Sequence, residues 1–96
     1  MNNDDLIWKG VLEFIYERTN ETAFELWITP LRFYGIEDNT AYIASDKEFC
    51  NNVVKRGYDK MLKDAFFIVI GKRVEIAYCE RWQIVVELLY KVTNLN

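Results

Sequence analysis

The chain has 96 residues, of which 51% are hydrophobic, 16% aromatic and 28% charged. This composition excludes disordered and collagen-like proteins, and four glycines and one proline provide no material for long linkers. The net charge of -3 disfavours a dedicated nucleic-acid binder, although residues 1–48 carry ten acidic and four basic side chains and residues 49–96 carry five and eight. We therefore expect one small domain with an uneven charge distribution.

The sequence has no histidine, and its two cysteines, Cys50 and Cys79, form no CxxC motif. We therefore expect no metal, no cofactor, and two thiols in a reducing cytoplasm. Acid–base or nucleophilic catalysis would need a tuned carboxylate pair or an activated thiol, and because no spacing suggests either, we expect no enzyme. The acidic, polar N-terminus and the lack of a long apolar run predict a cytoplasmic protein without membrane contact.

The first two predicted elements are helices. Asp4 or Asp5 can cap the first one, in which apolar residues recur every three or four positions as far as Thr19. Asn20 can cap a short second helix, and Pro30 ends it because proline has no backbone donor for the next turn.

A β-hairpin is predicted next. Two short segments rich in aromatic and β-branched residues, 31–36 and 40–44, flank the turn-forming residues 37–39.

A long helix is predicted from residue 46 to about residue 70. Ser45 and Glu48 fit a capping box at its start, Gly57 is the position at which we expect a bend, and Gly71 ends it.

In residues 73–78 polar and apolar side chains alternate, which predicts a third strand. In residues 79–96 the apolar residues have helical spacing, but the high content of β-branched residues favours a strand. We expect a domain of residues 1–78 with a helical extension, 79–96, packed on it. The predicted fold class is α/β, in the order α-α-β-β-α-β, with helices on one face of a three-stranded sheet.

Four basic residues fall within about 140° of one another on the long predicted helix. They are Lys55, Arg56, Lys60 and Lys63. This basic stripe is either a contact for nucleic-acid backbone or a solvated helix face, and the overall acidity favours the solvated face.

Phe49 lies roughly half a turn away from the apolar stripe of that helix. It is therefore either an exposed anchor for a partner or a residue covered by another element, and the sequence leaves both open. Trp8 falls toward the beginning of the first apolar helix face, where a core position is favoured over a docking position.

Three segments together resemble the N-terminal domain (domain I) of DnaA, the bacterial chromosomal replication initiator. They are Leu6-Ile7-Trp8, the segment from Thr22 to Leu31 with its Phe-x-x-Trp-Ile-x-Pro-Leu signature, and Ala44-Ser45-Asp46-Lys47-Glu48-Phe49. The likeness runs from Leu6 to Tyr78 and includes the Asp38-Asn39-Thr40 turn and the Gly71-Lys72 helix end.

The resemblance implies a KH-like fold and a protein–protein interaction module in bacterial replication initiation. It implies self-association through Trp8, a weak homo-oligomer, and recruitment of the replicative helicase or binding of initiation regulators. The residues that it assigns to partner binding are Ala23, Leu26, Trp27, Phe49 and Cys50.

Members of that family continue into a polar linker, an ATPase domain and a helix-turn-helix. The apolar segment 82–92 is not linker-like, which favours a stand-alone protein with an added element. Ala23 also stands where some members carry an acidic residue. The alternative function is a KH-like single-stranded nucleic-acid binder that uses the basic stripe, but no two glycines have GxxG spacing, so we expect at most weak binding.

Overall fold

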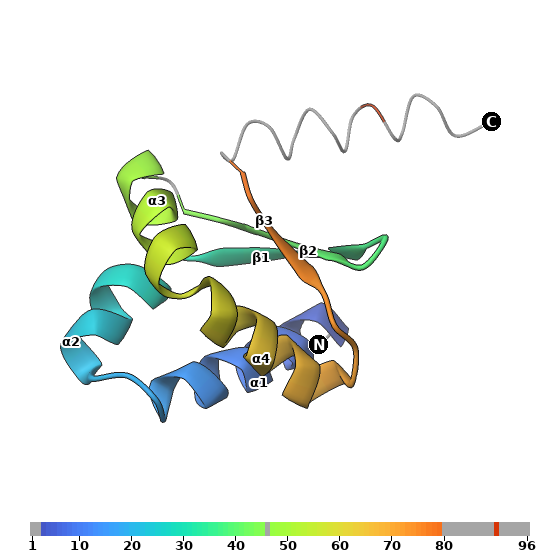
Figure 1. Ribbon diagram of the computed structural model, residues 1–96, viewed down its shortest axis with the longest axis horizontal. Coiled ribbons are helices and arrows are strands. Elements are labelled where there is room, and N and C mark those ends of the chain that lie inside the picture. The colour runs from blue at the N-terminus through green and yellow to red at the C-terminus, as the bar shows by residue number, and fades with distance from the viewer. Residues whose placement is uncertain (1–2, 46, 80–89, 91–96) are drawn as a thin grey trace.

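The computed structural model describes residues 3–45, 47–79 and 90. Its elements are α1 (Asn3–Tyr16), α2 (Glu21–Ala23), the π-helical turn η1 (Phe24–Ile28), β1 (Arg32–Glu37), β2 (Thr40–Ala44), α3 (Glu48–Gly57), α4 (Asp59–Ile70) and β3 (Glu75–Tyr78). The helices lie on one face of the sheet (Figure 1). The expected KH-like α/β class is thus confirmed. The helix expected within residues 79–96 falls outside the described residues, apart from Cys79 and Tyr90.

The sheet has the strand order β1-β2-β3. β1 and β2 are antiparallel, and they are joined by Asp38 and Asn39, whose φ values of 51° and 61° form the left-handed two-residue turn that Asp and Asn tolerate well. β2 and β3 are parallel, so the chain must cross over between them, and α3 and α4 form that crossover. This connection places α4 against β3 and against α1.

The core lies between the helices and the sheet. Its buried residues come from α1, η1, β2, α3, α4 and the connections before β1 and β3. They are Val11, Ile15, Ile28, Leu31, Ala41, Ile43, Val54, Leu62, Ala65, Phe66 and Val74. No helix in the described part of the chain combines the length and the apolar character needed to cross a membrane.

The long helix predicted from residue 46 is two helices. α3 ends at Gly57, where we expected a bend, and Tyr58 adopts φ -126° and ψ 2°, outside the helical region. The N–H of Tyr58 still donates to the carbonyl of Val54 (2.7 Å), so α3 closes normally and α4 starts anew in a different direction. As predicted, Gly71 ends α4 in the left-handed conformation, with φ 73°.

The capping box predicted at Ser45 and Glu48 is wrong. The residue before α3 is Lys47, and no side chain caps this helix. The Ser45 hydroxyl oxygen instead accepts a hydrogen bond from the N–H of Lys47 (3.2 Å), inside the loop. Ser45 is held there because its backbone N–H and carbonyl are both bonded to the side chain of Asn51.

Candidate partner-binding surface

α2 and η1 lie beside α3 at the end of the molecule opposite the β-hairpin turn (Figure 1). The side chain of Asn20 caps α2 by accepting from the N–H of Ala23 (2.8 Å). The helix then widens into the π turn, closed by the N–H of Thr29 donating to the carbonyl of Phe24 (2.9 Å). This turn buries Ile28 completely and leaves Leu26 55% exposed.

Phe49 is the second residue of α3, and its side chain is 68% exposed. Its ring centroid lies 5.8 Å from that of the half-buried Trp27, and the two rings are tilted by 56°. Phe49 thus contacts η1 on one side and is exposed on the other, so no element of the described part of the chain covers it completely. We call Leu26, Trp27 and Phe49 the docking surface.

The two other residues that the family resemblance assigned to partner binding lie deeper. Cys50 is buried, with 7% of its surface exposed, and Ala23 is half-buried. Cys50 therefore offers little surface to a partner, and Ala23 lies four positions before Trp27. The exposed neighbours of the docking surface in the sequence include Glu25, Lys47 and Glu48, so both signs of charge border its apolar centre.

Asn51 fixes the start of α3, and sequence reasoning missed it. Its side-chain oxygen accepts from the N–H of Ser45 (2.8 Å), and its side-chain nitrogen donates to the carbonyl of Ser45 (3.3 Å). Both residues are buried, so this pair of bonds is shielded from water. The available signal was a polar residue three positions before the core residue Val54, on the apolar face of α3.

Trp8 contacts other aromatic rings than those of the docking surface. Its ring stacks on Phe33 at 5.5 Å between centroids and lies 6.4 Å from the ring of Phe66. Trp8 is half-buried and packs against the core, as the sequence favoured.

The basic stripe is divided between two helices. Lys55 and Arg56 are exposed at the end of α3, and within the described residues neither has an ion-pair partner. On α4, Lys60 pairs with Asp64 (3.0 Å).

Lys63 is the most engaged cation of the stripe. It pairs with Asp59 (3.0 Å) and with Glu75 of β3 (3.2 Å). Hydrogen bonds to these two carboxylates raise the pKa of Lys63. No group of three residues in the described part of the chain has the donors and geometry to hold a metal ion.

Comparison with known proteins gives a consistent result. The model of the DnaA N-terminal domain family matches residues 5–67. The chain is 31% identical over 78 residues to the chromosomal replication initiator protein DnaA of Thermodesulfovibrio yellowstonii, covering 81% of the chain and 18% of that protein. It is also 31% identical over 77 residues to the DnaA protein of Lachnoclostridium phytofermentans, covering 74% of the chain and 17% of that protein. The chain thus spans less than a fifth of the length of these curated relatives.

Proposed function

Because the chain belongs to the DnaA N-terminal domain family, we propose that it acts in the initiation of bacterial chromosome replication as a non-catalytic protein-interaction module. The observation that carries this proposal is the outward-facing ring of Phe49 beside Trp27. An exposed aromatic side chain on a rigid element is the usual anchor of a protein interface. Leu26 extends the apolar area on the η1 side, and charged residues border it.

The partner that we propose is the replicative helicase or a regulator of initiation. The fixed start of α3 supports a docking role, since a side chain held in place before binding loses little conformational entropy when the partner arrives.

We also propose weak self-association through Trp8. Only part of its side chain is accessible, because the ring packs on Phe33 and close to Phe66. A small contact area of this kind supports a dimer only at high concentration.

The alternative function, binding of single-stranded nucleic acid, has less support. Lys60 and Lys63 are paired with carboxylates, so among the residues that the structure describes only Lys55 and Arg56 of the basic stripe lack an ion pair that competes with phosphates. Two cations supply little of the electrostatic free energy on which such binding depends.

Calorimetric titration of the intact chain with purified replicative helicase from the same bacterium tests the proposal. Phe49→Ala is compared with Ile68→Ala, which removes an apolar side chain of similar exposure (66%) from α4, away from the docking surface. We expect Phe49→Ala to weaken binding by about 30-fold, the effect of losing an interface anchor of about 2 kcal/mol. Ile68→Ala should bind like the wild type.

Equal affinities of the two variants for helicase would contradict the proposal that the docking surface binds it. No binding of helicase by the wild type would overturn the helicase as partner, and the same three proteins would then be titrated with each purified initiation regulator. The melting temperature of each variant shows whether it is folded.

A further inference from the structure

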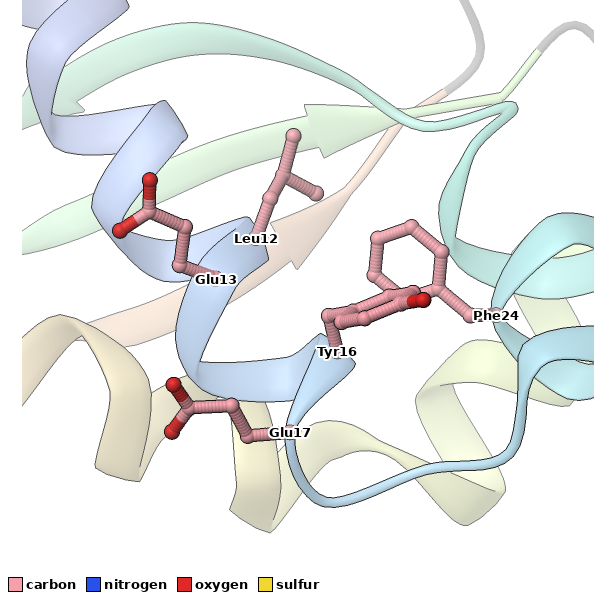
Figure 2. A pocket seen from close by; sticks show the side chains of 5 residues that line it. All are labelled: Leu12, Glu13, Tyr16, Glu17 and Phe24. Atoms are coloured by element: carbon pink, nitrogen blue, oxygen red, sulfur yellow. The ribbon is translucent and has the colours of Figure 1, made fainter.

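A pocket lies between α1 and η1, on the side of η1 that carries Phe24. Leu12, Glu13, Tyr16, Glu17 and Phe24 line a shallow pocket of about 300 Å³. Figure 2 shows the ring of Tyr16 directed from the end of α1 toward Phe24, with Glu13 on the same helix and Glu17 directly after it. This volume is at the lower end of the range for small-molecule sites and is large enough for one long side chain.

The aromatic part of the pocket is formed by two rings in edge-to-face contact. The centroids of Tyr16 and Phe24 lie 5.2 Å apart at 89°, and Tyr16 is 55% exposed. The edge-to-face contact holds the Tyr16 ring in place and leaves a face accessible. An accessible aromatic face attracts cations, guanidinium groups in particular.

In the acidic part of the pocket, two glutamates repel each other and the negative end of the α1 dipole. α1 has no basic residue in its last turn, where its dipole is negative. Glu13 stands in that turn, and Glu17 follows the helix directly, four positions later. Arg18 lies 3.8 Å from Glu17, but its guanidinium donates to the carbonyl of Phe14 and covers the ring of Phe14 at 3.5 Å. Glu13 has no side-chain partner in the described part of the chain. A bound cation would offset this repulsion.

We propose that this pocket binds an arginine side chain of a partner protein. The guanidinium would stack on Tyr16 while its N–H groups bond to the carboxylate of Glu13, and the methylene groups would lie against Leu12 and Phe24. A planar cation with several donors fits an aromatic face next to a carboxylate better than the compact ammonium of lysine. The chain already places Arg18 and Arg73 over phenylalanine rings in the same manner.

The test is an NMR titration of the full chain with N-acetylarginine amide, and with N-acetylcitrulline amide as its uncharged counterpart. We expect saturable shifts centred on Glu13, Tyr16 and Phe24, with a dissociation constant in the millimolar range for the arginine compound alone. Glu13→Gln should weaken binding at least about fivefold. The matched control Glu25→Gln, an exposed glutamate in η1, should have no effect.

Three outcomes would overturn the proposal: shifts that never saturate, equal binding of citrulline, or equal binding by Glu13→Gln and Glu25→Gln. Sedimentation of the free proteins distinguishes one further occupant, because a loss of self-association in Glu13→Gln would mean that a second copy fills the pocket. Phe49→Ala should bind N-acetylarginine amide with wild-type affinity. The test of the pocket is therefore independent of the test of the docking surface.

Discussion

The rings of Trp27 and Phe49 lie 5.8 Å apart although the whole β-hairpin separates them in the sequence. This contact joins η1 to α3, so the residue that we propose as the anchor of the docking surface also helps to hold the two helical segments together. The effect of a Phe49 substitution on binding must therefore be interpreted together with its effect on the stability of the protein. Because 68% of Phe49 is already exposed, Phe49→Ala should lower the free energy of unfolding by no more than about 1 kcal/mol.

Asn51→Ala should destabilise the protein by about 2–3 kcal/mol, because it leaves the buried N–H and carbonyl of Ser45 without partners. The neighbouring Asn52→Ala, at an exposed position, should change the free energy of unfolding by less than about 0.5 kcal/mol. Urea denaturation measures both. The variant Asn51→Ala should also bind helicase more weakly, since α3 no longer begins at a fixed position. Equal stability of the two variants would show that Asn51 does not fix the loop.

Trp8→Ala should lower the free energy of unfolding by about 2–4 kcal/mol, because it removes the ring that packs on Phe33 and near Phe66. Trp8→Phe keeps an aromatic ring there and should cost about 1 kcal/mol. Leu6→Ala, on the same helix and 54% exposed, is the control and should stay within about 0.5 kcal/mol. Thermal denaturation gives these values.

Sedimentation equilibrium of the same three variants tests self-association. Trp8→Phe should be folded and should associate less than the wild type, whereas Leu6→Ala should associate normally. If Trp8→Phe associates as well as the wild type, Trp8 serves the core alone and the dimer contact lies elsewhere.

Most of the fold could be predicted because local chemistry determines it. Asn20 caps its helix, Asp38 and Asn39 accept the left-handed turn, and Gly71 ends α4, each within a few residues of the sequence. The start of α3 could not be predicted in this way. The capping pattern at Ser45 was present. However, the N–H of Ser45, which a capping box would bond to Glu48, donates instead to the side chain of Asn51, six residues later.

The candidate surface was predicted only in part, since exposure depends on contacts between distant segments. The angular position of Phe49 indicated that it lies off the apolar stripe, but only the packing of α3 on η1 shows which side remains open. The positive charge of the basic stripe is similarly reduced by a residue outside α3 and α4, since Lys63 pairs with Glu75 of β3. Glu75, the first residue of β3, reaches Lys63 because β3 packs beside α4, a relationship that no local spacing contains.

Tyr78 should make the protein less stable at high pH. Its hydroxyl donates to Asp59 (2.8 Å), and burial together with this bond raises the pKa of Tyr78. The unfolded chain loses the tyrosine proton near pH 10. The stabilisation is therefore complete below about pH 10 and falls as the pH rises toward the folded-state pKa, since the native state then binds more protons than the unfolded state.

Denaturation between pH 7 and 11.5 measures this loss, with Tyr78→Phe as the comparison. The wild type should lose stability more steeply than Tyr78→Phe above about pH 10. The raised pKa of Lys63 adds a loss in the same direction, but its ion pairs are accessible to solvent and are screened by salt, so measurements at high salt isolate the tyrosine part. Identical pH profiles of the two proteins at high salt would contradict the role of Tyr78.

Single-stranded DNA should bind the chain weakly, with a shallow dependence on salt. Each phosphate contact with a single strand contributes about -0.7 to the slope of log K against log salt. Lys55 and Arg56, the two cations of the basic stripe without an ion pair among the described residues, therefore predict a slope of about -1.4 for binding through this stripe. Fluorescence anisotropy with a short labelled oligonucleotide measures it. Asp64→Asn frees Lys60 from its ion pair and should steepen the slope by about 0.7, which serves as a positive control. A wild-type slope near -2.8 would mean that all four cations of the basic stripe contact phosphate, and the nucleic-acid function would then replace the one proposed here.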